Sequence, residues 1–245
     1  MCTVTYLPLS NNGYLLTSSR DEQAVRPLAS PPRSAVVGGR EVCFPRDPQG
    51  GGTWIAAAGR TAVCLLNGAS EPHVSRPPYR HSRGLVPLHC FTFATIDQFL
   101  AQSDFGGIEP FTLVVAEPNR LVVLRWNGQD AAVGEADPRR AHLWSSVTLY
   151  TPSTRAKRTQ WFEGWLRNHP VRSVANIRHF RRPSGDGDPA NDLRMNRLSS
   201  DSGSQLHTVS LTSVRSESGQ TDLFYEDLMA STFTHHAVAN CCESV

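Results

Sequence analysis

The chain has 245 residues, 39% of them hydrophobic and 19% charged, with a formal net charge of +2 at pH 7. This length can bury a large core within one domain, and so small a net charge argues against a nucleic-acid-binding protein. No apolar run approaches the roughly 18 residues of a membrane span, and the N-terminus lacks the charged-then-apolar pattern of an export signal. We therefore expect a cytoplasmic protein with no transmembrane segment.

The first predicted element is a hairpin. Residues 2–7 and 15–19 read as strands, and the second runs into Arg20-Asp21-Glu22. Between them lies Asn11-Asn12-Gly13, the strongest short-range hairpin signal. Because an antiparallel hairpin brings the start of one strand beside the end of the other, Cys2 is expected near Arg20 and Asp21.

Cys2 is chemically informative because it directly follows the initiator Met1. If Met1 is removed, one residue carries both a thiol and an α-amine, whose ordinary pKa of about 7.7–8.0 suits a general base. Arg20 would favour the thiolate, and a carboxylate could orient the ammonium group. Alternation places Arg20 and Glu22 on one strand face and Asp21 on the other. The alternatives are a chance Met-Cys start and an ion cluster on the surface of a hairpin.

The next segment predicts a strand, a tight turn at Gly59-Arg60, and a second strand that ends on Asn67. An amide at a strand end can donate a hydrogen bond to a developing oxyanion. Asn-Gly is also a common turn sequence, so an ordinary turn role for Asn67 is the alternative.

The remaining chain alternates predicted strands and helices. We expect helices over residues 95–103, 152–166 and 171–180, the second with an apolar stripe that packs on the core. Hairpins are expected over residues 111–126 and 205–226, and a surface loop over 183–191. This organisation predicts one domain over residues 1–228 and a flexible C-terminal tail over 229–245.

Several motifs, in order, resemble the Asn-Arg-Asp-Glu (NRDE) family, which includes the transport-and-Golgi-organisation type. The matching elements are Met1-Cys2, Arg20-Asp21-Glu22 with Arg26-Pro27, Gly51-Gly52-Thr53-Trp54, Leu66-Asn67, and residues 82–86, 111–116 and 145–150. This family is similar to N-terminal-nucleophile (Ntn) hydrolases of the penicillin V acylase and conjugated bile acid hydrolase branch. The resemblance implies an α+β fold, an αββα sandwich of two stacked antiparallel sheets flanked by helices.

The same resemblance implies an amidohydrolase that cleaves a non-peptide C–N amide bond of a small molecule. Cys2 would be the nucleophile and, through its amine, the base. Arg20 and Asp21 would hold it, and Asn67 would stabilise the oxyanion. Three further residues of these motifs are assigned to substrate binding, namely Glu22, Trp54 and Ser146.

The chain departs from the family signature at Ser19, which replaces its first asparagine. Two further departures favour an alternative. Arg20 and Asp21 are adjacent, whereas in the hydrolases the arginine and the aspartate lie three apart, and Val209 occupies the position of an expected arginine. The alternative is a non-catalytic binding or trafficking protein that uses the same pocket for haem or acyl lipids. A haem ligand could then be His142, His207 or Cys2.

The cysteine and histidine spacing predicts no metal site and no bound cofactor. The six cysteines show no Cys-x-x-Cys spacing, so we expect reduced thiols and no covalent haem. His235-His236 and Cys241-Cys242 match no closed zinc pattern and are assigned to the tail.

Overall fold

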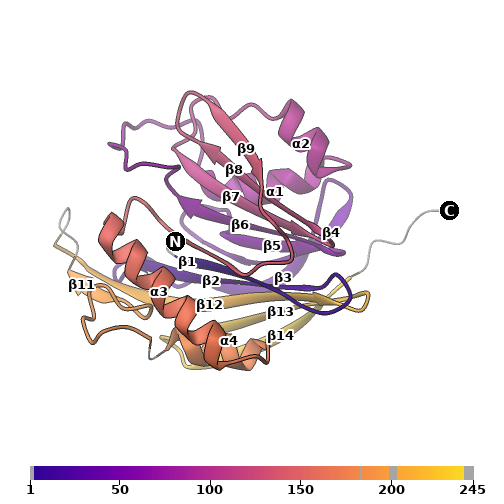
Figure 1. The fold of residues 1–245 in the computed structure, drawn as a ribbon. Helices are drawn as coiled ribbons and strands as arrows, with labels where there is room; N and C mark the ends of the chain where they lie inside the picture. Colours follow the sequence, from indigo (N-terminus) through magenta and orange to yellow (C-terminus); the bar gives the residue numbers. More distant parts are fainter. Residues whose placement is uncertain (1–2, 183, 199–202, 240–245) are drawn as a thin grey trace.

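The computed structural model describes residues 3–182, 184–198 and 203–239, and it has four layers (Figure 1). Two antiparallel sheets stack face to face, and helices cover the outer face of each sheet. This arrangement confirms the predicted α+β sandwich.

Sheet A has the strand order β10-β1-β2-β12-β13-β14, with β11 paired to β12. Its strands are β1 (Thr3–Pro8), β2 (Tyr14–Gln23), β10 (His142–Ser145), β11 (Asn196–Leu198), β12 (Gln205–Glu217), β13 (Gln220–Asp227) and β14 (Thr232–Val238). Sheet B follows chain order: β3 (Ser30–Val37), β4 (Arg40–Arg46), β5 (Ile55–Ala58), β6 (Thr61–Asn67), β7 (Phe111–Glu117), β8 (Arg120–Trp126) and β9 (Ala131–Glu135).

The helices are α1 (Val86–His89), α2 (Ile96–Gln102), α3 (Pro152–Asn168) and α4 (Val174–Arg181), with short 3₁₀ turns at Arg83–Leu85 and Cys90–Thr92. Helices α1 and α2 lie over sheet B, and α3 and α4 lie over sheet A (Figure 1). Helix α3 begins where predicted, because the Thr151 side chain caps it and Pro152 occupies its first turn.

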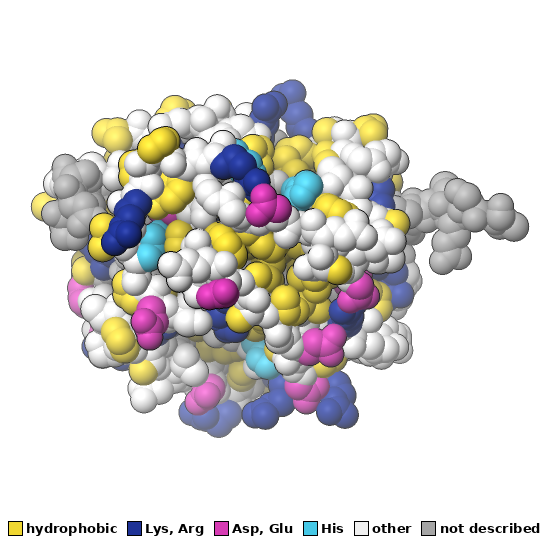
Figure 2. Space-filling view, turned by 90° about the horizontal axis from the view of Figure 1, so that it is seen from above, with side chains coloured by type: hydrophobic (Ala, Val, Ile, Leu, Met, Phe, Trp, Pro, Cys, Tyr) yellow, Lys and Arg dark blue, Asp and Glu magenta, His cyan; other side chains and the backbone are white. Residues whose placement is uncertain are grey.

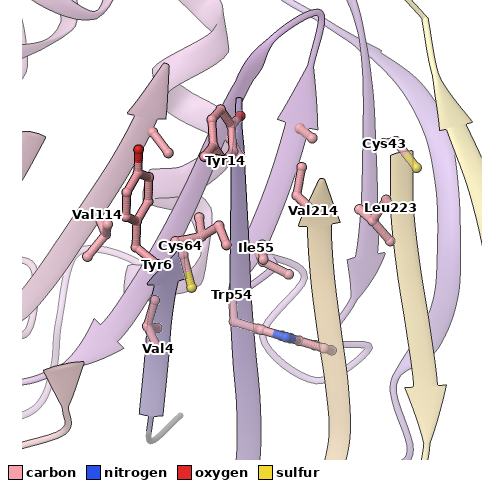
Figure 3. Packing of buried hydrophobic residues seen from close by; sticks show 14 of the residues in the cluster. Val4, Tyr6, Tyr14, Cys43, Trp54, Ile55, Cys64, Val114, Val214 and Leu223 are labelled. Atoms are coloured by element: carbon pink, nitrogen blue, oxygen red, sulfur yellow. The ribbon is translucent and has the colours of Figure 1, made fainter. Parts of the chain in front are cut away.

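Three apolar layers hold the sandwich together. Alternate residues of β1 and β2, including Val4 and Tyr6, pack between the sheets against Cys64 and Trp54 (Figure 3). The intervening residues, such as Leu7, face α3 and α4 instead. The period of two in each strand therefore separates the inter-sheet core from the helix-facing core.

The hairpin between β1 and β2 forms as predicted. Asn11 and Asn12 have φ angles of 53° and 61°, and Thr3 pairs with Ser19 at the far end of the ladder. Asparagine tolerates this left-handed region better than other side chains, which explains the turn sequence.

The C-terminal segment differs from the expected tail. Residues Thr232–Val238 form β14, which pairs along its whole length with β13. As an edge strand it buries only Val238 fully, so it carries little of the apolar signal by which a strand is recognised. Strands β3, β4, β9 and β10 were also not predicted, and most of their side chains are likewise exposed or half-buried.

A chain ending at Leu228 is expected to unfold at a lower temperature than a chain ending at Ala239. Loss of β14 removes a ladder of hydrogen bonds and the burial of Val238, which alone is worth about 1.5–3 kcal/mol. The midpoint should fall by at least ~4 °C in a thermal unfolding experiment. Equal midpoints for the two chains would contradict the structural role of β14.

Candidate functional site

The start of β1 is fixed by its neighbours in sheet A and by side chains of the helices that cover this sheet. Cys2 lies outside the described residues, but its neighbour Thr3 is fully buried and pairs with Ser19 on one side and Ser145 on the other. Arg158 Nη1 donates to Thr3 Oγ1 at 2.6 Å, and Arg181 Nη1 donates to Thr3 O at 3.0 Å.

Arg181 anchors both strands of the hairpin from α4. The side chain is 1% exposed. Its guanidinium donates at 2.6–3.0 Å to Thr3 O, Thr5 Oγ1, Thr17 O and Ser19 Oγ. Burial lowers the pKa of Arg181 to about 9, against the opposing effect of the nearby Asp21 charge. The residue therefore remains cationic at neutral pH.

Asp21 belongs to the same buried region, on the helix-facing side of sheet A. Its carboxylate accepts hydrogen bonds from Tyr150 Oη at 2.6 Å and from Thr208 Oγ1. The Arg158 guanidinium lies over the Tyr150 ring, 3.6 Å from its centroid. Asp21 is thus linked through Tyr150 and Arg158 to Thr3, the residue that follows Cys2.

Arg20 points in the opposite direction, into a cavity of about 530 Å³ that we call the Arg20 cavity. Arg20 Nη2 lies 3.4 Å from Glu22 Oε2 and 3.8 Å from Asp47 Oδ2, and its guanidinium lies 4.9 Å from the Trp54 ring centroid. Burial alone would raise the pKa of Asp47, but the hydrogen bond and charge of Arg26, together with the charge of Arg20, hold that pKa below its ordinary value. The carboxylates thus neutralise the positive charge of the cavity.

Two of the sequence motifs meet at the wall of this cavity. Thr53 N donates to Gly84 O at 2.7 Å, which joins the Gly-Gly-Thr-Trp segment to the matching element at residues 82–86. A Cβ atom on Gly52 would lie 2.2 Å from Gly84 C and O, so only glycine permits this contact. Gly51 also has a φ of +69°.

Asn67 stands between the Arg20 cavity and a second cavity of about 490 Å³, which we call the Arg155 cavity. Ser146 Oγ donates to Asn67 O at 2.8 Å and fixes the end of β6. The side-chain amide of Asn67 makes no hydrogen bond with another described residue. It is therefore free to donate into either cavity.

The Arg155 cavity lies between α3, β10 and the adjacent ends of the sheet B strands. Its wall includes Arg125 of β8, Trp144 and Ser145 of β10, and Arg155 of α3. Ser145, which lines the Arg155 cavity, pairs with Thr3 on one side of β1, and Arg20, which lines the other cavity, follows Ser19, the partner of Thr3 on the other side. The Ser145 hydroxyl is buried without a hydrogen-bond partner among the described residues, in contrast to that of Ser146.

The predicted site residues are thus divided between three places. Arg20, Glu22 and Trp54 share the Arg20 cavity, and Ser146 lines the Arg155 cavity. Asn67 lines both, whereas Asp21 lines neither and lies in the buried network behind β2. Their roles in catalysis and binding remain predictions.

Sequence reasoning missed the two buried arginines. Arg158 lies on the same buried face of α3 as Phe162 and Trp165. Arg181 lies on the same buried face of α4 as Ile177. A charged residue on an otherwise buried helix face is a signal that the sequence did contain.

Two of the histidines singled out by the sequence, His142 and His235, have ordinary partners. His142 Nε2 lies 2.8 Å from Asp137 O, and His235 Nε2 lies 2.8 Å from Asp222 Oδ1. Cys241 and Cys242 fall outside the described residues. Within the described ranges, no cluster of three or more His, Cys, Asp or Glu side chains could hold a metal ion.

We expect Gly52→Ala to lower the unfolding midpoint by about 2–10 °C and to disturb the Arg20 cavity. The added methyl group overlaps backbone atoms of Gly84, and overpacking of this kind costs about 1–3 kcal/mol. The matched control is Gly134→Ala, where a Cβ meets no atom within 4 Å. If the two variants unfold alike, the contact between the two motifs does not contribute to stability.

We also predict slow alkylation of the three described cysteines in the folded protein. Burial raises the pKa of Cys43 to about 11 and of Cys64 to about 12, and the pKa of Cys90 well above its ordinary value. At pH 8 the thiolate fraction of each is then roughly one in a thousand or less, whereas Cys2 should react first. Peptide mapping after timed iodoacetamide treatment measures the rates, and rapid labelling of Cys64 would contradict this prediction.

Comparison with known families agrees with the motif resemblance. The model of the family described as transport and Golgi organisation 2 matches residues 1–180. The chain therefore belongs to this family. No curated protein matches the chain. Among the described residues, no helix is both long and apolar enough to span a membrane.

Proposed function

We propose that this member of the transport and Golgi organisation 2 family is an N-terminal-cysteine amidohydrolase that cleaves a non-peptide C–N amide bond of a small molecule. One observation carries the proposal. The Asn67 amide, which has no hydrogen-bond partner among the described residues, lies at the junction of two cavities that flank the anchored start of β1.

The proposed reaction requires removal of Met1. The α-amine of Cys2 takes the thiol proton, and the thiolate attacks the substrate carbonyl carbon to form a C–S bond. Asn67 Nδ2–H donates to the resulting oxyanion. The C–N bond then breaks, and the departing amine takes the proton held by the α-amine. Water cleaves the thioester, releasing the acid and restoring the thiol.

The cavities suit the two halves of a small amide. Their volumes of about 490 and 530 Å³ lie within the usual range for small-molecule sites. The acyl part would occupy one cavity and the amine part the other, with the scissile carbonyl beside Asn67. Arg158 and Arg181 act on Thr3 and are positioning residues in this scheme.

A non-catalytic binding or trafficking role for haem or acyl lipids is the second candidate. It is favoured by the environment of Arg20, which is engaged by Glu22 and Asp47, and by Val209 at the expected arginine position. In this case the same cavities would hold a ligand that is released unchanged.

Turnover measurements on amide substrates separate the two candidates. Cys2→Ala should abolish hydrolysis, and Asn67→Ala should lower kcat by about 10²–10³ through loss of an oxyanion donor. Cys43→Ala, which removes a thiol remote from both cavities, should keep wild-type turnover. Activity that survives in Cys2→Ala would overturn the hydrolase proposal.

The state of the N-terminus is an independent check. Intact mass should show loss of Met1, and a reagent selective for 1,2-aminothiols should modify Cys2. Retention of Met1 on protein from its native host would leave Cys2 without a free amine and would favour the binding role.

A further inference from the structure

The two cavities differ sharply in charge. The Arg20 cavity contains three arginines and three carboxylates, and each arginine has a carboxylate within 4.0 Å. The Arg155 cavity contains two arginines, Arg125 and Arg155, and no acidic residue. Among the described residues, neither of these arginines forms an ion pair with a carboxylate, so the cavity carries two uncompensated positive charges.

The position of Arg155 adds to this imbalance. It lies near the N-terminus of α3, a 17-residue helix whose first turn has no acidic side chain. A cation at a helix N-terminus is repelled by the helix dipole, whereas an anion there is stabilised. The Nε atom of Arg155 is also buried without a hydrogen-bond partner in the described part of the chain, which is a further cost to the empty protein.

Polar and apolar groups line the rest of the same cavity. The hydroxyl of Ser145 is a second buried group without a partner, and Trp144 and Leu143 supply apolar wall. Such a mixture suits a small organic molecule with one charged end better than a bare ion. Charged side chains of both signs are interspersed on the face of the molecule shown in Figure 2.

We propose that the Arg155 cavity is a subsite for the anionic end, a carboxylate or a phosphate, of an amide ligand. Arg125 and Arg155 donate to the anion, and the amide carbonyl reaches Asn67 at the boundary with the Arg20 cavity. As a statement about the substrate, this inference rests on the proposed amidohydrolase function. As a statement about binding, it can be tested without turnover.

The test is calorimetric titration of full-length protein carrying Cys2→Ala. The probes are hexanoylglycine, N-hexanoylphosphoethanolamine and the uncharged hexanoylglycinamide. At least one anionic probe should bind about tenfold or more tightly than the neutral probe, because a charge-assisted hydrogen bond is worth about 1.5–3 kcal/mol. The tighter of the two anionic probes identifies the carboxylate or the phosphate as the preferred group.

Arg125→Gln and Arg155→Gln should each weaken binding of that anionic probe by about tenfold or more and leave the neutral probe unaffected. Arg33→Gln, which removes the same charge from an exposed position on β3, is the matched control and should change nothing. In the ligand-free protein, Arg155→Gln should keep or raise the thermal midpoint, because it removes a repelled cation. Weaker binding of the anionic probe without a lower thermal midpoint would show that the substitution affects binding and not folding.

Three results would overturn the subsite. They are equal or absent binding of charged and neutral probes, an equal loss of anionic-probe binding in Arg33→Gln, or loss of the preference for the anionic probe only in Arg20→Gln.

The proposed function can fail independently of the subsite. If wild-type protein binds the anionic probe through Arg125 and Arg155 but hydrolyses no amide, the subsite stands and the amidohydrolase does not. If amides are hydrolysed without any dependence on these arginines, the reverse holds.

Discussion

Two buried guanidinium groups, those of Arg158 and Arg181, hold the beginning of this fold in place. Taking a cation out of water costs several kcal/mol unless its donors are satisfied, so both side chains need a fixed set of acceptors. The two terminal nitrogens of Arg181 find them on β1 and β2, while its buried Nε has no partner among the described residues, and Arg158 finds them on Thr3 and on the backbone of Asn191 and Asp192. The helices are thereby tied to the first residues of the chain.

This constraint fixes the start of β1, where a chain would otherwise be poorly ordered. Chain termini are usually among the least ordered parts of a domain. Here Thr3, the first residue that the structure describes, is paired on both sides within sheet A and hydrogen-bonded from both helices. The entropy cost of ordering Thr3 is therefore offset by the folding of the sandwich.

Much of the fold could be predicted from local patterns. The Asn11-Asn12-Gly13 turn, the alternation in β1 and β2 and the capped start of α3 each follow from residue chemistry within a few positions. The edge strands could not be predicted in this way. β14 is half-polar, and its place in the sheet depends on pairing with β13 and not on its own composition.

The site was predictable only in part, for a similar reason. The predicted hairpin sets Thr3 opposite Ser19, next to Arg20, and Arg20 and Asn67 line one cavity, but the partners of Asp21 come from more than a hundred residues away. Tyr150 and Thr208 have no local signature that marks them as partners of a carboxylate. The two cavities and the contrast in their charge likewise depend on which acids fold next to which arginines.

The adjacency of Arg20 and Asp21 has a simple structural consequence. Neighbouring residues of a strand face opposite sides, so this pair cannot serve one pocket as residues on the same face could. The pairing of β2 with β12 has a one-residue irregularity at this point. Thr208 lies opposite Asp21 and Ser210 lies opposite Arg20, so Val209 is left between the two pairs. Val209 is thus the residue at which the register shifts, and it is buried. The arginines of the two cavities come from other positions: Arg20, Arg26 and Arg83 line the Arg20 cavity, and Arg125 and Arg155 line the Arg155 cavity. A ligand that bridges the cavities would meet a neutralised arginine at one end and two uncompensated arginines at the other, and this polarity would fix the direction in which an amide lies across Asn67.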